Sequence, residues 1–453
     1  MMQKRIRQLV WILLAVLVIY TGVSVYFMDH FFPGTSINNM NVEYLTTDQV
    51  NQLILQQAEG YKLVLKGRQA QIEELEPKNL GVTYYETDAA WQAKRAQNGF
   101  LWPRMFWQTD SYQMTAGTSF DEELLLAAVR ALKMVQNGRP PQNAWVEMTE
   151  DGYEIHPEEP GNRVIVKNLE EQIKGAISNQ LPELDLDETG CYQMPGITTE
   201  SEKITDLTGQ LDNWLGTKVT YEFGPETEVV DGKVISSFIH LDGYTASLDP
   251  EAVTGWVQEL AESRDTYKKP RNFKSTLRGV ITVKGGNYGW QIDQEAESEA
   301  LFAHIEQGDT ITKEPAYSHR GNVWSTNYDI GDTYIEVDMG AQHMWFYKNG
   351  RLVVDTDVVT GNMSRGYRTP AIVASVQYKA RNAVLRGANY ATPVKYWMPF
   401  YGNYGIHDAN WRVNFGGNIY MTNGSHGCVN TPPANMKIIF ENAEKGTPVI
   451  LYY

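Results

Sequence analysis

Cysteine is scarce in this chain, whose 453 residues include only Cys191 and Cys428. Two cysteines cannot build a disulfide framework, and no CxxC pair or Cys/His spacing suits a structural zinc site. Positive charge is also in short supply, with 39 Lys and Arg against 55 Asp and Glu and a net charge of −16. This balance argues against a nucleic-acid-binding protein, which needs a basic face for phosphates. At roughly 100–200 residues per domain, the length predicts two to four globular domains.

One long apolar run lies near the N-terminus, from Leu9 to Phe27, after three cations within residues 1–8. As a helix at ~1.5 Å per residue the run extends about 28 Å, close to the ~30 Å hydrocarbon core of a bilayer. A cleaved signal peptide usually has a shorter apolar stretch and a small-residue cleavage site. Cations before the run and none directly after it place the N-terminus in the cytoplasm. The sequence therefore predicts a cytoplasmic tail at 1–8, a single transmembrane helix at 9–28, and an extracytoplasmic remainder in the cell membrane.

The next segments predict a short tether and two related α+β modules. Residues 29–40 are rich in turn-forming residues and are expected to be the tether. Asp151 to Ile155 recurs loosely as Tyr288 to Ile292, and each copy follows a β-rich segment and precedes an apolar helix pattern. A further helix is expected to open at Asp249 and Pro250. These signals predict a first module at 41–200 and a second at 201–325.

A change of charge marks the last domain. Residues 326–453 contain eleven Lys and Arg against nine Asp and Glu, so the acidic excess lies upstream. Alternating strands flank Asn349-Gly350, a strong hairpin signal. One clear helix is expected from Thr431 and Pro432 to Ala443, stopped by Gly446, with a last strand at Val449 to Tyr452. The sequence predicts a mainly β domain with one helix at 326–453.

The chemistry concentrates in this domain, where His407 and then His426 precede Cys428 among glycines. A cysteine nucleophile needs a nearby base or cation, because a free thiol with a pKa of ~8.5 is mostly protonated at pH 7. Glycines such as Gly427 allow backbone N–H groups to approach a developing oxyanion. The pattern favours a cysteine acyltransferase, and a three-ligand zinc site is the alternative. Cys191 has no histidine nearby and is expected to be structural.

These residues also carry a family resemblance. The segment from Ser425 to Asn430, with His407 twenty-one residues before the cysteine, resembles the signature of the L,D-transpeptidases, the YkuD family. The resemblance covers about 125 residues, from near Tyr328 to Tyr453. It is strongest to the membrane-anchored Gram-positive branch, which places peptidoglycan-binding-like modules between the membrane helix and the catalytic domain.

The resemblance implies a β-sandwich-like fold and a reaction without metal or other cofactor. Cys428 would attack the carbonyl of the third residue of a donor tetrapeptide stem and release D-Ala. An amine of an acceptor stem would resolve the thioester into a 3→3 cross-link in the cell wall. The same resemblance implies His407 as general base, Asp408 in its orientation, and His426 and the Gly427 amide at the oxyanion.

The chain departs from the family pattern at two places. Thr369-Pro370 is not followed by the usual glycine, which puts the shape of the substrate loop in question. Asn430 stands where many members have arginine. Tyr390, Trp397 and Asn430 are candidates for substrate binding, although aromatic residues here are more often part of the core.

Three alternatives remain open at this point. Water in place of the acceptor amine would make the protein an L,D-carboxypeptidase. A wall-binding anchor with an inactive C-terminal domain is a non-enzymatic alternative, which the presence of His407, His426 and Cys428 disfavours. A sortase-like enzyme would need a Thr-x-Thr-Cys pattern and a later arginine, and the pattern is absent.

Overall fold

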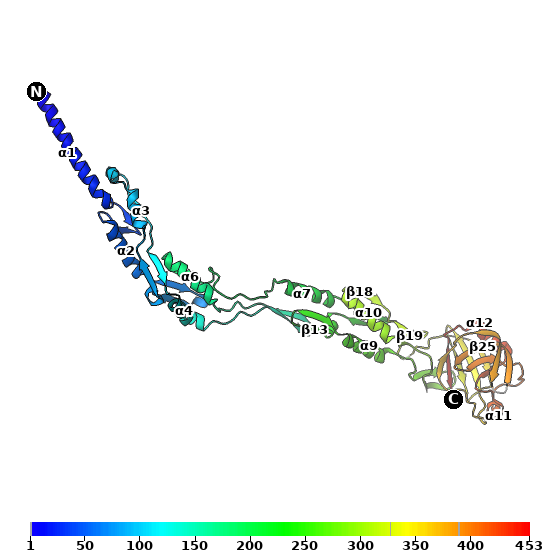
Figure 1. Cartoon of the computed structure of the whole chain (residues 1–453). Helices are drawn as coiled ribbons and strands as arrows, with labels where there is room; N and C mark the ends of the chain where they lie inside the picture. Colours follow the sequence, from blue (N-terminus) through cyan, green and yellow to red (C-terminus); the bar gives the residue numbers. More distant parts are fainter. Residues whose placement is uncertain (1, 327, 388–389) are drawn as a thin grey trace. The chain divides into compact units, whose positions relative to one another are not determined.

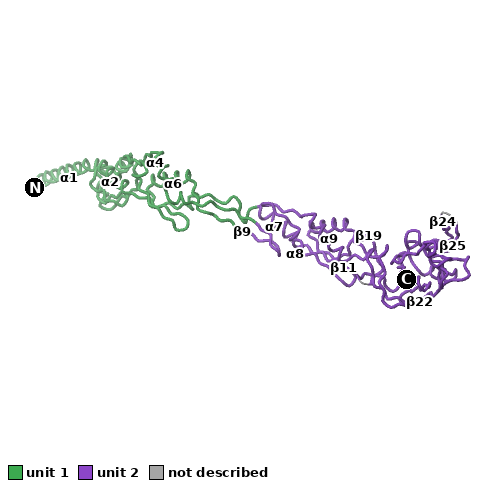
Figure 2. The backbone as a smooth tube through the Cα atoms, turned by 90° about the horizontal axis from the view of Figure 1, so that it is seen from below, with its two compact units in different colours: residues 1–145, 156–201 green, residues 146–155, 202–453 purple. Residues whose placement is uncertain are grey.

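We describe the fold from a computed structural model of the 453-residue chain (Figure 1). The structure describes all residues except 1, 327, 388 and 389, and only the backbone of Tyr390. The described chain divides into two compact units, coloured in Figure 2. Unit 1 contains residues 1–145 and 156–201, and unit 2 contains residues 146–155 and 202–453.

The N-terminal helix α1 (Met2–Asp29) is continuous through the predicted tail and span. In the described chain it is the one helix long and apolar enough to cross a membrane, a test that a signal sequence also passes. Its N-terminal part extends away from the rest of unit 1 (Figure 1). Ser24 and Phe27, in contrast, are buried, so the C-terminal turns of α1 belong to the folded unit.

The expected tether at 29–40 differs in the structure, because this segment is folded into the core of unit 1. Phe31 and Phe32 are almost completely buried, and the backbone of Phe31 pairs with Tyr44 and Leu45. The segment supplies β1 (Ser36–Ile37) and begins β2 (Met40–Asn41). Turn-forming residues here build tight bends between short strands, and the two phenylalanines stabilise them by burial. No free linker therefore separates α1 from the first module.

The first module packs helices against small sheets. A three-stranded sheet has the order β10-β3-β4, in which β10 is parallel to β3 and β4 is antiparallel to it. Its main core contains Leu63, Leu125, Leu169 and Ile173. The remaining elements of this region are α2 (Thr47–Glu59), β3 (Leu63–Lys66), η1 (Arg68–Ala70), β4 (Ile72–Leu75), η2 (Pro77–Leu80), β5 (Val82–Tyr85), α3 (Ala89–Ala96), η3 (Gly99–Phe106), β6 (Ser111–Tyr112), β7 (Gly117–Phe120), α4 (Glu122–Ala131), α5 (Lys133–Gln136), α6 (Val166–Ser178) and β10 (Glu183–Asp185).

The second module repeats this topology. Its sheet has the order β12-β11-β18, with β18 parallel and β12 antiparallel to β11. The predicted helix at Asp249-Pro250 is present as α9, with the Asp249 side chain as its N-cap. The elements are α7 (Glu202–Leu215), β11 (Lys218–Phe223), β12 (Glu226–Val230), α8 (Gly232–Ser236), β13 (Ile239–Asp242), β14 (Thr245–Leu248), α9 (Pro250–Arg264), β15 (Arg271–Ser275), β16 (Gly279–Val283), β17 (Gln291–Ile292), α10 (Gln294–Gln307), β18 (Thr310–Lys313) and β19 (Tyr317–His319).

The border between the modules differs in one respect from the predicted division at 200/201. The hairpin of β8 (Trp145–Thr149) and β9 (Gly152–His156) lies before that point in the sequence, yet residues 146–155 belong to unit 2. The Tyr153 hydroxyl donates to the Asp212 carboxylate of α7 at 2.8 Å, and the Ser236 hydroxyl donates to the Glu150 carbonyl. These contacts attach the hairpin to the second module.

The C-terminal domain contains two sheets around one hydrophobic core. A five-stranded sheet has the order β22-β21-β20-β28-β23, and a four-stranded sheet has the order β24-β25-β26-β27. Their shared core contains Ile335, Phe346, Met398 and Ile406, with Met436, Ile439 and Phe440 from α12. The elements are β20 (Tyr334–Asp338), β21 (His343–Lys348), β22 (Arg351–Asp357), β23 (Val373–Ser375), β24 (Ala380–Gly387), β25 (Tyr390–Tyr401), β26 (Tyr404–Asp408), α11 (Ile419–Asn423), β27 (Val429–Thr431), α12 (Pro433–Asn442) and β28 (Pro448–Tyr452).

Local sequence signals for this domain are confirmed in most details. Asn349 and Gly350 both have positive φ in the turn between β21 and β22, as the hairpin signal predicts. The helix α12 starts slightly later than expected, at Pro433, and buries the predicted apolar face. The short helix α11 was not predicted.

The second module and the C-terminal domain share one compact unit and are held together by buried contacts. Phe273 of β15 packs with Tyr452 of β28 and Val373 of β23 in one hydrophobic cluster. The Arg271 guanidinium donates from Nε to Asp329 at 2.6 Å, and both side chains are buried. Residues on the two sides of the predicted border at 325/326 therefore pack against each other within one compact unit.

Candidate active site

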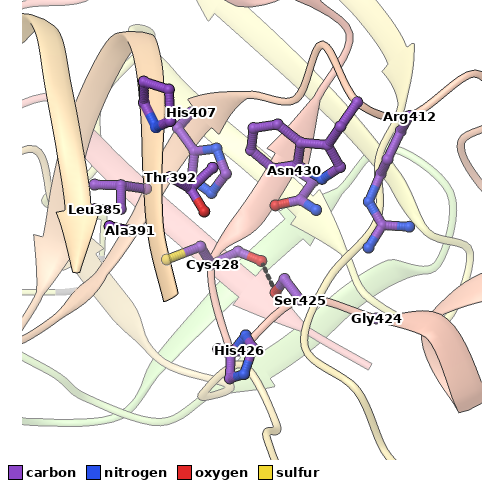
Figure 3. A pocket seen from close by; sticks show the side chains of 12 residues that line it. Leu385, Ala391, Thr392, His407, Arg412, Gly424, Ser425, His426, Cys428 and Asn430 are labelled. Carbon is purple, nitrogen blue, oxygen red and sulfur yellow. Dashed lines mark hydrogen bonds between the residues drawn. The ribbon is translucent and has the colours of Figure 1, made fainter. Parts of the chain in front are cut away.

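Pairing of β26 with β27 brings the two halves of the motif together. The strands are parallel, with His407 opposite Asn430 and Ile406 opposite Val429. Cys428 directly precedes β27, so its position corresponds to the residue before Ile406 in this register. Figure 3 shows the side chains of His407 and Cys428 in the same pocket. The pairing of β26 with β27 thus brings His407 and Cys428, which are separated in sequence, into the same pocket.

His407 is buried and oriented by the main chain. Its Nδ1 lies 2.9 Å from the carbonyl oxygen of Asp408, which can only accept a hydrogen bond. Nδ1 therefore carries the proton and Nε2 keeps the lone pair. Burial is the largest influence on the imidazole and lowers its pKa below the usual 6.5. His407 is consequently a neutral base at pH 7.

Asp408 acts on His407 through its carbonyl group, whereas its carboxylate has a different contact. The carboxylate oxygen Oδ1 accepts from the backbone N–H of Tyr396 at 2.8 Å. This bond fixes β26 against β25. The predicted orienting role of Asp408 thus has a main-chain basis in this structure.

The Cys428 thiol is protonated at rest. Burial raises its pKa to about 11, although the Gly405 N–H acts in the opposite direction. The Sγ atom lies 3.7 Å from the carbonyl oxygen of Asn403, a further contact that suits a thiol proton. The expectation that neighbouring histidines increase the thiolate fraction does not match this environment. Attack by the sulfur requires a base that accepts the proton during the reaction.

The loop before Cys428 is held by Ser425 and Thr369. The Ser425 hydroxyl donates to the carbonyl of Cys428 at 2.5 Å and accepts from the Gly427 N–H at 3.0 Å. The Thr369 hydroxyl donates to the Gly427 carbonyl at 2.8 Å. Gly427 has φ +116°, and a Cβ there would lie 2.4 Å from the Tyr404 ring, so glycine is required. The Gly427 amide, predicted as an oxyanion donor, is engaged with Ser425 in this structure.

His426 and Asn430 both line the pocket, but they differ in solvent exposure. His426 is exposed, and its ring lies 4.6 Å from that of Tyr367. Asn430 is buried, and its Oδ1 atom has no hydrogen-bond partner among the described residues. A buried amide oxygen without a partner is costly unless a ligand completes it. This geometry suits the predicted role of Asn430 in substrate binding.

The two aromatic candidates differ in position. Trp397 is buried, lies opposite His407 in the β25–β26 register, and packs against it with ring centroids 5.9 Å apart. The indole thus packs against the His407 ring, and the residues lining the pocket do not include Trp397. The backbone of Tyr390 begins β25 opposite Gly387, and the remainder of this residue lies outside the described structure.

The pocket has a volume of about 470 Å³ and contains residues that sequence reasoning missed. Trp411 and Arg412 follow the His407-Asp408 pair closely, and this proximity in sequence was the available signal. The opposite wall comes from β24 and β25, whose contribution no sequence pattern indicates. The lining residues outside the predicted set include Leu385, Thr392, Pro393, Trp411, Arg412 and Ser425.

Cys191 lies in a different environment. It is completely buried in the core of the first module, and burial raises the pKa of its thiol. Its sulfur contacts the Thr189 hydroxyl at 3.5 Å. An inaccessible thiol of this kind suits the predicted structural role.

Comparisons with known proteins identify related domains over most of the chain. The L,D-transpeptidase catalytic domain family, YkuD, matches residues 332–451, and the peptidoglycan-binding domain family matches residues 73–185 and 197–312. A cysteine-to-serine variant of the Enterococcus faecium L,D-transpeptidase is 38% identical, with 56% of this chain and 100% of that chain covered and a TM-score of 0.47. The carbamoyl enzyme of Ldtfm with avibactam is 38% identical, with 55% and 99% covered and a TM-score of 0.48. No curated protein sequence matches the chain.

A catalytic domain is also similar over a shorter range. The catalytic domain of the E. faecium L,D-transpeptidase acylated by ertapenem is 48% identical, with 27% of this chain and 98% of that chain covered and a TM-score of 0.25. A buried histidine and a cysteine that share a pocket at neighbouring strands of one sheet, in a domain of two sheets, define a cysteine-dependent acyltransferase. The sequence matches over the catalytic domain and both modules then decide the family. The chain belongs to the L,D-transpeptidases of the YkuD family and is a peptidoglycan L,D-transpeptidase.

Proposed function

We propose that Cys428 attacks the carbonyl carbon of the third residue in a donor tetrapeptide stem. The sulfur–carbon bond forms, and the thiol proton passes to Nε2 of His407. The bond between the third residue and D-Ala then breaks, and His407 returns the proton to the departing amine. The observation that carries this assignment is the neutral His407, which keeps its Nε2 lone pair in the pocket of a protonated thiol.

The second half of the reaction reverses these roles. The amine of an acceptor stem attacks the thioester and loses a proton through His407 to the Cys428 sulfur, which leaves as a thiol. The product is a 3→3 cross-link. Water in place of the amine gives a tripeptide, the carboxypeptidase outcome.

We assign the oxyanion to the loop that precedes β27. His426 lines the pocket, and the Gly427 and Cys428 amides belong to the same short loop. Donation by Gly427 to an oxyanion requires its N–H to exchange the Ser425 hydroxyl for the substrate oxygen. Two N–H donors aimed at the developing charge are the usual device for acyl transfer.

Two further side chains suit parts of the donor stem. The Asn430 Oδ1 atom has no partner among the described residues and can accept from a peptide N–H of the stem. Arg412 is the sole Arg or Lys among the pocket-lining residues, and its buried Nε atom has no hydrogen-bond partner among the described residues. Burial lowers the pKa of this guanidinium, which indicates partial loss of water. We assign it to the terminal carboxylate of D-Ala, which ends the donor stem beside the scissile bond.

We further propose that α1 anchors the enzyme in the cell membrane with residues 1–8 in the cytoplasm. The apolar length of the helix and the cations at its start support this topology. The two modules, predicted at 41–200 and 201–325, follow α1 in the chain and precede the catalytic domain at 326–453. Their family match supports contact with peptidoglycan.

The nucleophile can be tested with the full chain and a purified disaccharide-tetrapeptide. Cys428→Ala should abolish the 3→3 dimer, whereas Cys191→Ala should keep it, as measured by mass spectrometry of the products. Dimer formation by Cys428→Ala would refute the mechanism. If the native enzyme produced tripeptide but no dimer, the activity would be that of a carboxypeptidase and not that of a transpeptidase. Because the similar E. faecium domain is acylated by ertapenem, a single carbapenem adduct is expected on Cys428.

A further inference from the structure

An exposed aromatic patch lies on η3 and the residue that follows it. Phe100, Leu101, Phe106 and Trp107 are 45%, 55%, 70% and 76% exposed. Single exposed apolar residues are normal on a protein surface, but several large ones within one short segment indicate a surface that meets a partner or a membrane. We call residues 99–107 the aromatic segment.

The aromatic segment packs directly against α1. A Cβ on Gly99 would lie 2.5 Å from the Ser24 carbonyl oxygen, so only glycine allows this backbone approach. The Tyr20 hydroxyl donates to the carbonyl of Phe100 at 2.5 Å. The Tyr20 and Trp102 rings lie 5.9 Å apart. Close approach through a small residue is the usual way in which segments pack inside membranes.

The position of this contact along α1 determines how deep the aromatic segment would lie in the bilayer. The apolar run needs its whole length, Leu9 to Phe27, to cross a ~30 Å hydrocarbon core. The part before the contact, from Leu9 to Ile19, would cover only about 16 Å at ~1.5 Å per residue. If Phe27 marks one interface, Tyr20 lies about 10 Å inside it. The aromatic segment must then enter the bilayer together with the C-terminal turns of α1.

The chemistry of the segment suits such a place. Its backbone is largely satisfied by turns, since the Leu101 N–H donates to Asn98 and the Trp107 N–H donates to Arg104. The Arg104 charge is paired with Asp110 at 2.6 Å. Tryptophan and phenylalanine are typical of the membrane interface, where apolar faces enter by about 5–10 Å.

We infer that residues 99–107 are a second membrane-binding element, which inserts into the leaflet through which α1 leaves the bilayer. This inference rests on the proposed span of α1. The partner is the lipid interface itself, because the exposed aromatic segment packs directly on α1, whose own apolar side chains are exposed. The segment would hold the first module at the membrane surface with a fixed orientation to α1.

Depth-dependent quenching tests this inference in the full chain. A single cysteine is introduced as Trp107→Cys in a Cys191→Ala, Cys428→Ala background and labelled with the fluorophore NBD. Val16→Cys reports on α1, and Ile72→Cys, an exposed apolar position on β4, is the matched control. The proteins are reconstituted in phosphatidylglycerol and phosphatidylethanolamine vesicles with nitroxide-labelled acyl chains.

We expect at least twofold quenching at positions 107 and 16 and none at position 72. Quenching at position 16 but not at position 107 would show that the aromatic segment does not enter the membrane, while the proposed span of α1 would stand. No quenching at 16 would overturn the span and the inference with it. Phe106→Cys is a second reporter on the same exposed surface, and it guards against a local effect of losing the indole.

Discussion

The imidazole of His407 donates from Nδ1 to the main-chain carbonyl of Asp408 at 2.9 Å. The proton on Nδ1 leaves Nε2 as the acceptor in the pocket, and the fixed ring needs no carboxylate to choose its tautomer. This relationship separates the enzyme from a triad in which an aspartate side chain orients the base. Several consequences can be measured.

His407→Ala should lower the rate of carbapenem acylation by about 10²–10⁴-fold, because the thiol then lacks a general base. Asp408→Asn is the matched variant, since it keeps the carbonyl and an oxygen that can accept from Tyr396. We expect its rate to stay within a few-fold of the native enzyme. A side-chain triad would instead lose about 10⁴-fold on this change. Stopped-flow acylation kinetics distinguish the two cases.

The pH dependence of the Cys428 thiol should follow its raised pKa. Because burial raises this pKa to about 11, the thiol is protonated at pH 7 and its alkylation by iodoacetamide should still increase above pH 9. Acylation by substrate should depend on neutral His407, whose pKa is lowered below 6.5. The rate should therefore hold as pH falls from 7 to 6.5 and decline only at lower pH. An alkylation plateau at neutral pH would contradict this.

Arg412→Ala should weaken binding of a donor that ends in a free carboxylate. The expected change is a rise of about tenfold in KM, the effect of a charge-assisted bond of ~1.5 kcal/mol. A donor whose terminal carboxylate is converted to an amide should lose little on the same substitution. Equal losses for both donors, measured by tripeptide and dimer formation, would show that Arg412 serves another role.

The buried pair of Arg271 and Asp329 should control the stability of unit 2. Arg271→Met leaves the Asp329 carboxylate buried without its partner and is expected to cost about 3–5 kcal/mol of unfolding free energy. The exposed pair of Arg320 and Glu314 is the control, and Arg320→Met should change stability by less than about 1 kcal/mol. Chemical denaturation followed by tryptophan fluorescence measures both. A similar small effect for the two variants would contradict the proposed link between module and catalytic domain.

The sequence was most informative where function or structure depends on local patterns. The Asn349-Gly350 turn and the apolar face of α12 are short-range signals, and both are confirmed. The segment from Ser425 to Asn430, together with His407 upstream, resembles the signature of the YkuD family, and the comparisons confirm that family. The repeated modules were visible only as a weak similarity, yet their sheets have the same topology.

Features that depend on contacts between residues distant in sequence could not be predicted from local sequence patterns. The segment at 29–40 has the composition of a linker, but burial of Phe31 and Phe32 makes it part of a core. The hairpin at 146–155 joins unit 2 through contacts with α7 and α8. The sequence around Tyr20 does not indicate that this residue contacts the aromatic segment, which lies 80 positions later in the chain.

The sequence by itself determined the candidate residues for the chemistry, because the histidines and the cysteine of the motif are defined by residue type and spacing. Only the tertiary structure decided the environment in which each of them lies. Burial raises the pKa of Cys428 and lowers the pKa of His407, and the register of β25 against β26 places Trp397 opposite His407. The physical reason is that desolvation and packing depend on which distant segments surround a side chain, and local sequence does not contain that information.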